Sequence, residues 1–232
     1  MRDFVKEENV VRGLRLALVA TLATAVYLAY EYLVVRGEFV EAQLGGASPA
    51  PRFALDVLGI FVALFISATA GFAWARGGRL AGFGTWRRLK RDLVLIVPVG
   101  AALAVLTFVV LEPTLYKPLL GRRNLFQPVF VASFEEVICR WGIFAIAFRL
   151  SRRIWPSVLT SALFNVVVGA NAMLRFAAHS DVSVPPWQFA AIIAVKLVLA
   201  IGYALFFVRK GLLSTMALRF VAALPTPFLA LF

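Results

Sequence analysis

The sequence of 232 residues is poor in charged residues, and it contains one cysteine and one histidine. The single cysteine, Cys139, excludes an internal disulfide, and its place inside an apolar run favours a small buried residue. Charged residues make up 16% of the chain and hydrophobic residues 62%, which excludes an ordinary soluble globular protein. The composition therefore indicates an integral membrane protein whose first partner is the lipid bilayer.

Acidic residues are also scarce, since 12 Asp and Glu stand against 24 Lys and Arg, for a net charge of +12. Such a balance is typical of nucleic-acid-binding proteins. Here most of the excess lies in short connections between apolar segments, where lipid headgroups and the rules of membrane insertion account for it. The sequence therefore predicts no nucleic-acid partner.

Long apolar runs dominate the rest of the chain. Runs of about 20 apolar residues are long enough to cross a bilayer, and they occupy 14–35, 53–74, 93–111, 126–148, 154–174, 189–208 and 212–232. The first has no cleavage site typical of a signal peptide, so it is interpreted as a true span. The sequence predicts an all-α bundle of about seven transmembrane helices, with residues 1–232 as a single membrane domain.

The longest connection, residues 75–92, contains four glycines and predicts a flexible or surface-lying link. Two prolines, Pro225 and Pro227, are expected to end the last helix near Leu224. No internal repeat or low-complexity tract is present. The connections leave no room for a soluble domain between the spans.

The distribution of Lys and Arg predicts the orientation. Fourteen of them flank one side of the predicted spans and six the other. Because cytoplasmic loops carry the excess of positive charge, we expect a cytoplasmic N-terminus, most simply in the plasma (inner) membrane. Trp86 beside Arg87 and Arg88 predicts an interfacial anchor, with a site for a partner protein as the alternative.

Three charged residues interrupt the fourth apolar run. Glu135, Glu136 and Arg140 lie in the middle of 126–148, where each ionised group costs roughly 2.5 to 3.5 kcal/mol on insertion scales. On a helix, Glu136 and Arg140 share a face and can pair, while Glu135 points about 100° away toward a neighbouring helix or a cavity. Such carboxylates suit general acid–base work or water activation, and the alternative is a charge-compensated contact that fixes helix packing.

These residues resemble the first motif of the CAAX protease and bacteriocin-processing (CPBP, or abortive-infection) family of intramembrane endopeptidases. The resemblance covers about residues 124–223. Members are multi-span helical proteins with Glu-Glu-x-x-x-Arg in one helix, Phe-x-x-x-His in the next, and His-x-x-x-Asn/Asp near the C-terminus. Glu135, Glu136 and Arg140 match the first motif, and Trp155-Pro156 opens the next span as the family's pattern implies.

The chain departs from the other two motifs. Phe164 is followed four positions later by Val168 instead of histidine, and Arg219 and Ala223 align best with the third motif. The one histidine, His179, falls in a predicted outer connection, where an exposed loop residue is the simpler interpretation and a replacement ligand the alternative.

Polar residues near these substitutions could replace some of the lost function. Asn165 and Asn171 lie one turn either side of Val168, and they are expected to form either a polar wall of hydrogen-bond donors or ordinary contacts between helices. Arg219 near Glu135 would act as a counter-ion and repel a divalent cation, so a water-activating site would become a salt bridge. Lys196 could do the same or extend to an interface. No metal site is predicted, and the sequence leaves the cofactor unknown.

Three functions remain open at this point. The resemblance implies an endopeptidase in which Glu135 activates water, Glu136 and Arg140 support it, and an asparagine steadies the oxyanion. Its substrate would be a membrane-associated, prenylated or leader peptide. The second is a catalytically silent relative that binds a hydrophobic or lipidated peptide, or a membrane protein, as a scaffold.

The third function is transport. Glu135, Glu136, Lys196 and Arg219 would then form a proton or solute relay at the membrane midplane.

Overall fold

The structure is a computed structural model that describes residues 6–32, 49–75, 80–116, 125–179 and 184–225. Every regular element in these ranges is a helix, so the predicted all-α class is confirmed. The elements are α1 (Glu7–Tyr30), α3 (Pro49–Trp74), α4 (Trp86–Val105) with its continuation η2 (Leu106–Tyr116), α5 (Gln127–Phe130), η4 (Val131–Ile143), α6 (Phe144–Ser151), α7 (Ile154–His179), α8 (Pro186–Lys210) and α9 (Leu212–Ala223).

Five helices are long and apolar enough to cross a membrane. They are Glu7–Tyr30, Ala50–Trp74, Trp86–Leu111, Ile154–Asn171 and Pro186–Lys210. By length and composition these are five spans, fewer than the predicted seven. The fourth run is not among them, because it is divided among α5, η4 and α6 and carries charged residues. The last run forms α9, whose 12 residues extend about 18 Å at 1.5 Å per residue, short of the ~30 Å hydrocarbon core. Its end at Ala223 agrees with the predicted effect of Pro225.

The link over residues 75–92, predicted to be flexible or surface-lying, is helical in its second half. There α4 begins at Trp86, and Thr85 Oγ1 accepts a hydrogen bond from Arg88 N at 3.3 Å. The residues before α4 bond to the corner between α8 and α9, through Leu212 N to Gly82 O at 3.0 Å. That corner needs glycine, because Gly211 has φ 91° and a Cβ there would lie 2.8 Å from Gly82 O.

The prediction that His179 lies in an outer connection is wrong, because its backbone is helical. Helix α7 continues through the predicted end at residue 174 to His179. The sequence 174–179 contains neither glycine nor proline, so no residue there stops the helix. Its side chain lies outside the described residues.

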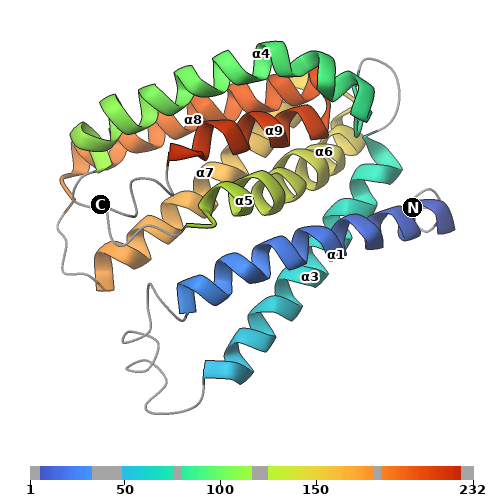
Figure 1. Ribbon diagram of the computed structural model, residues 1–232, viewed down its shortest axis with the longest axis horizontal. Coiled ribbons are helices and arrows are strands. Elements are labelled where there is room, and N and C mark those ends of the chain that lie inside the picture. Colours follow the sequence, from blue (N-terminus) through green and yellow to red (C-terminus); the bar gives the residue numbers. More distant parts are fainter. Residues whose placement is uncertain (1–5, 33–48, 76–79, 117–124, 180–183, 226–232) are drawn as a thin grey trace.

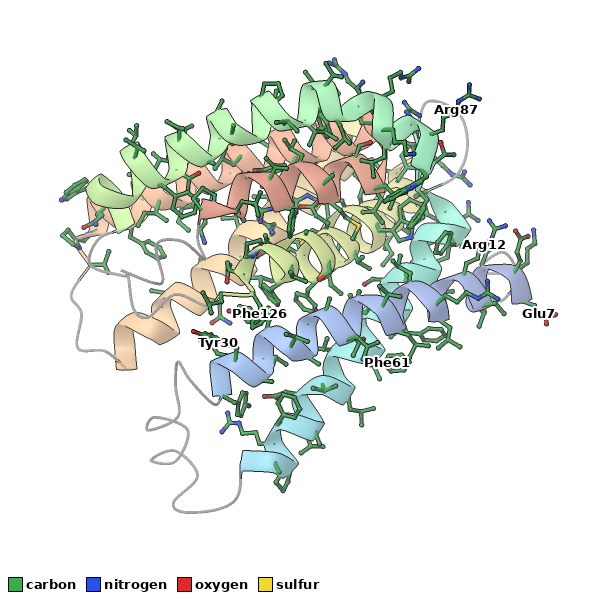
Figure 2. All side chains as sticks on the ribbon, viewed as in Figure 1. Glu7, Arg12, Tyr30, Phe61, Arg87 and Phe126 are labelled. Atoms are coloured by element: carbon green, nitrogen blue, oxygen red, sulfur yellow. The ribbon has the colours of Figure 1, made fainter. Side chains whose placement is uncertain are left out.

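The helices cross the bundle in alternating directions (Figure 1). One end of the bundle, drawn on the right, gathers the start of α1, the end of α3, the start of α4 and the corners between α6 and α7 and between α8 and α9. We call it the basic end, because it carries Arg12, Arg87, Lys90, Arg91, Arg152, Arg153, Arg209 and Lys210. Figure 2 labels Arg12 and Arg87 there.

The core places η4 through close contacts with small residues of α3. Trp141 is fully buried and packs edge-on against Phe72 and Phe207, with ring centroids 5.2 and 6.1 Å apart. A Cβ on Gly71 would lie 2.2 Å from the Trp141 ring, and a Cβ on Gly142 2.5 Å from Ser67 Cβ. The two helices therefore meet at backbone distance, which fixes where η4 presents its charged residues.

Aromatic contacts hold the other end of this helix against α1. Tyr27 stacks on Phe130 with centroids 4.3 Å apart. Tyr30 meets Phe126 edge-on at 5.7 Å, and Figure 2 labels these two residues. Aromatic pairs of this geometry contribute about 0.5 to 1.5 kcal/mol each beyond the area that they bury. The continuous helix formed by α5 and η4 is thus held by α3 at Trp141 and by α1 at Phe130.

A polar contact joins α4 to α9. The carboxylate of Asp92 is buried on α4, and it accepts hydrogen bonds from Lys210 Nζ and Ser214 Oγ, each at 3.0 Å. Because Ser214 lies in the first turn of α9, this contact positions the helix that carries Arg219.

Replacing Asp92 by asparagine is expected to lower the free energy of unfolding by about 2 kcal/mol, because the amide cannot balance the Lys210 ammonium. Removing only the neutral bond, with Ser214→Ala, should cost about 1 kcal/mol. Denaturant unfolding in detergent micelles measures both. An Asp92→Asn loss no larger than that of Ser214→Ala would contradict the ionic role of this contact.

Candidate functional site: a buried charge cluster

The three charged residues of the fourth run lie on a π-helical segment. Helix η4 has 13 residues and i→i+5 hydrogen bonds, such as Phe144 N to Cys139 O. Sequence reasoning assumed an α-helix with 100° per residue, and the sequence carries no signal for the wider pitch. Single-turn π-bulges inside α-helices are frequent at functional sites, and η4 is a longer segment of the same pitch.

Glu136 and Arg140 form the predicted pair, and both side chains are fully buried. Arg140 Nε lies 3.6 Å from Glu136 Oε2, and Arg140 Nη2 donates to Ala200 O of α8 at 3.5 Å. The guanidinium also lies 5.9 Å from the ring centroid of Tyr203. The pair is therefore enclosed by η4 and α8.

Arg219 of α9 contacts both carboxylates. Its Nη2 donates a hydrogen bond to Glu135 Oε2, and its Nε lies 3.4 Å from Glu136 Oε1. The guanidinium stacks over the Tyr203 ring at 4.7 Å, a favourable cation–π distance. The counter-ion expected for Glu135 is present. We call Glu135, Glu136, Arg140 and Arg219 the charge cluster; its two carboxylates balance its two guanidiniums.

The charge cluster has a closed half and an accessible half. Glu136 and Arg140 have no exposed side-chain surface, whereas the side chains of Glu135 and Arg219 are 26% and 20% exposed. A polar group arriving from outside the core would therefore meet the Glu135–Arg219 pair first.

Lys196 of α8 brings a third cation close to this accessible half. Its side chain is half-buried and lies within electrostatic range of both Glu135 and Arg219. Gly169 of α7 makes room for it, since a Cβ there would lie 2.9 Å from Lys196 Nζ. The structure thus gathers all four residues considered for a relay, Glu135, Glu136, Lys196 and Arg219.

Helix α7 turns its small polar residues toward η4. Ser161 Oγ donates to Cys139 O at 2.7 Å, and Asn165 Nδ2 lies 3.6 Å from Cys139 Sγ. Cys139 is buried, as predicted. Gly169, which lies against Lys196, belongs to the same inward face. Ser161, Asn165 and Gly169 are four residues apart, and this spacing could have identified the face from the sequence.

Of the two alternatives for Asn165 and Asn171, the structure does not form the polar wall around Val168, and Asn165 makes a contact between helices. Phe164 and Val168 are 37% and 49% exposed, and Asn171 is exposed as well. Asn165 instead faces η4. Asn165 and Asn171 lie about 60° to either side of Val168 and so about 120° apart around the helix, which lets one face inward while the other is exposed. Sequence reasoning also missed Tyr203, whose ring lies beside both guanidiniums.

The chemistry of the charge cluster is that of mutually neutralised ions. Glu135 accepts a hydrogen bond from a guanidinium, and a fixed cation at that position repels a divalent metal ion. In the described part of the chain, no group of three or more His, Cys, Asp or Glu side chains is placed to hold a metal. The carboxylates therefore hold η4 and α9 together through Arg219.

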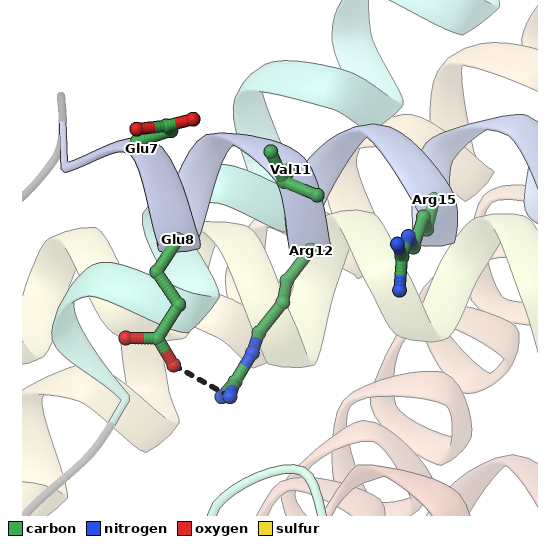
Figure 3. A pocket seen from close by; sticks show the side chains of 5 residues that line it. All are labelled: Glu7, Glu8, Val11, Arg12 and Arg15. Carbon is green, nitrogen blue, oxygen red and sulfur yellow. Dashed lines mark ion pairs between the residues drawn. The ribbon is translucent and has the colours of Figure 1, made fainter.

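A hollow of about 400 Å³ lies at the start of α1 (Figure 3). It is lined by Glu7, Glu8, Val11, Arg12 and Arg15, all from one helix. Glu8 and Arg12 form an exposed ion pair of 2.5 Å across it, of a kind that contributes little to stability. None of the predicted site residues lines this surface.

The candidate site thus consists of residues from η4, α8 and α9, with Asn165 and Gly169 of α7 behind them. The resemblance to intramembrane endopeptidases rests on Glu135, Glu136 and Arg140 and on their placement in the fourth run. In comparisons with known proteins, no family model, no curated protein and no solved structure matches this chain.

Proposed function

We propose that the protein is a membrane scaffold that binds a hydrophobic or lipidated peptide segment, and that it is a non-hydrolytic relative of the CPBP endopeptidases. The contact of Arg219 with both Glu135 and Glu136 carries this proposal. A carboxylate that acts as a general base must hydrogen-bond the water that it deprotonates. Here one of the two Glu135 oxygens, Oε2, accepts a hydrogen bond from Arg219, which ties this carboxylate to α9.

The accessible half of the charge cluster supports the binding role. An apolar segment that enters the membrane still carries polar backbone or terminal groups, and these need partners at depth. Glu135 and Arg219 offer an acceptor and a donor that are partly exposed. The apolar side chains of Phe164, Val167 and Val168 are exposed on the outward face of α7, and the proposal assigns the apolar part of such a segment to them.

The membrane arrangement belongs to the same proposal. We infer that the composite helix from α5 to α6 and the short α9 add two membrane-embedded segments to the five long helices, for the seven predicted. The basic end then faces the cytoplasm of the plasma membrane, together with the N-terminus. Labelling of single cysteines placed at Arg87 and at Arg52, on opposite ends, tests this orientation.

The proposed function is tested with protein reconstituted in liposomes. A library of membrane-anchored and leader peptides, each carrying a photo-crosslinker, is offered to the wild type, to Glu135→Gln and to Arg219→Leu. We expect wild-type protein to crosslink apolar peptides without cleaving them, and crosslinking to fall about tenfold in the Arg219→Leu variant, because a charged hydrogen bond contributes about 1.5 kcal/mol or more.

Cleavage by the wild type that Glu135→Gln abolishes would reject the scaffold proposal in favour of the endopeptidase. Crosslinking that is equal in all three proteins would mean that the charge cluster takes no part in binding. Unfolding curves of each variant serve as the control for folding.

A further inference from the structure

We propose that an anionic phospholipid binds along one face of α4, with its phosphate against Arg87 and Lys90. The side chains of Trp86, Arg87, Lys90 and Arg91 are all exposed at the start of this helix, Trp86 by 67%. At about 100° per residue they fall on one half of the helix circumference. We call these four residues the basic face of α4.

The opposite half of the same turns is packed against the bundle. Leu89 and Asp92 are buried there. The Arg88 side chain turns toward α8, where its Nη2 donates to Arg209 O at 2.7 Å. The first turns of α4 are therefore held in place by neighbouring helices, and the basic face is left for an external ligand.

The charge around the basic face is uniformly positive. Arg209 is exposed at the end of α8, directly beside α4. In the described parts of α4, α8 and α9 the acidic residue is Asp92, whose carboxylate is buried and bound to Lys210 and Ser214. No exposed carboxylate of these helices neutralises the cations, so an anion is the complementary partner.

The apolar continuation of the basic face indicates a lipid rather than another anion. From Arg87 and Lys90 the same helix stripe continues to Val94 and Val97, at spacings of three and four residues. Val94 is 83% exposed and Val97 53%, on a helix that is long and apolar enough to cross a membrane. The stripe therefore offers cations for a phosphate and, one turn deeper, apolar side chains for an acyl chain.

Trp86 marks the depth of this stripe. Exposed tryptophans gather at the boundary between headgroups and hydrocarbon, and Trp86 lies one residue before Arg87. A bound phosphate at Arg87 and Lys90 would then lie at the headgroup level. A nucleic acid or an acidic protein could meet the cations, but neither would use Val94 and Val97.

The experiment measures lipid binding to the delipidated full-length protein by native mass spectrometry. Phosphatidylglycerol and phosphatidylcholine with identical acyl chains are titrated separately. We expect phosphatidylglycerol to bind more tightly, and the double variant Arg87→Gln, Lys90→Gln to weaken it about 25-fold, at about fivefold per cation near a headgroup. Phosphatidylcholine binding should stay unchanged.

The matched control is Arg152→Gln, Arg153→Gln, which removes two exposed cations from the same end of the bundle at the corner between α6 and α7. It should leave phosphatidylglycerol binding within about twofold of the wild type. An equal loss in both double variants would overturn the proposed site, because the effect would then be one of total charge. Equal binding of the two lipids to the wild type would overturn it as well.

The source of the phosphate is tested by competition. Inorganic phosphate and soluble glycerol phosphate, at millimolar concentration, are not expected to displace phosphatidylglycerol, because neither reaches Val94 and Val97. Displacement by either would overturn the lipid assignment in favour of a soluble anion. Tighter binding of a DNA oligonucleotide or an acidic peptide at Arg87 and Lys90 would likewise overturn it. The exposed positions of both pairs make folding defects easy to exclude by circular dichroism.

Discussion

Replacing Arg219 by leucine is expected to lower the free energy of unfolding by about 3 kcal/mol. The change removes a side chain that contacts both Glu135 and Glu136, and with it the guanidinium that is hydrogen-bonded to Glu135. Breaking a buried pair costs about 3 to 5 kcal/mol, and the lower value applies because Glu135 and Arg219 are partly exposed. Unfolding by sodium dodecyl sulfate in mixed micelles, followed by circular dichroism, measures the loss.

A second change should recover much of this loss. Adding Glu135→Gln to Arg219→Leu removes the uncompensated carboxylate and keeps the buried pair of Glu136 and Arg140, so the double variant is expected within about 1 kcal/mol of the wild type. The control is Arg15→Leu, which removes an exposed arginine from α1 and should change stability by less than about 0.5 kcal/mol. Losses that simply add in the double variant would show that the two residues are not coupled.

Gly71→Ala is expected to destabilise the protein by about 3 kcal/mol or more. A Cβ at position 71 would lie between 2.2 and 2.4 Å from three atoms of the Trp141 ring, and Trp141 is fully buried among Phe72, Phe83 and Phe207. No rotation of a buried indole relieves contacts this short, so α3 and η4 must move apart. Thermal unfolding in detergent measures the effect.

The same helix offers a matched control. Gly59 also lies in α3, and a Cβ there would meet nothing within 4 Å, so Gly59→Ala should leave stability unchanged or raise it by up to about 1 kcal/mol. Combining Gly71→Ala with Trp141→Leu should cost less than the sum of the single changes, because the smaller side chain admits the new methyl group. Equal effects of Gly71→Ala and Gly59→Ala would contradict the close contact.

Much of the helical frame could be predicted, because the length of an apolar run is a local property. Each of the seven runs contains a helix, and α9 ends near the predicted proline-induced stop. The pair of Glu136 and Arg140 was also predictable, since it depends on two residues four apart on one helix. The link before α4 was not, because its order comes from hydrogen bonds to Val208, Leu212 and Leu213, far away in the sequence.

The π-helical pitch of η4 and the rotation of α7 about its axis could not be predicted from the sequence either, because neither follows from residue spacing along one helix. The sequence placed Asn165 and Val168 on one face, but the rotation of α7 is set by which residues pack against η4. Ser161 and Asn165 contact Cys139 there, and Val168 turns outward. Hydrophobicity gives no guide in this case, because valine is favoured equally by a protein core and by lipid.

By itself, the sequence determined that this chain forms apolar helices suited to a bilayer, that positive charge gathers between them on one side, and that Glu136 can pair with Arg140. These properties follow from composition and from short spacings along one helix. Only the tertiary structure decided that Arg219 contacts Glu135 across 84 positions of sequence, and that Gly169 admits Lys196 beside them. Such contacts depend on which faces of distant helices meet, and that choice is made by the packing of the whole bundle.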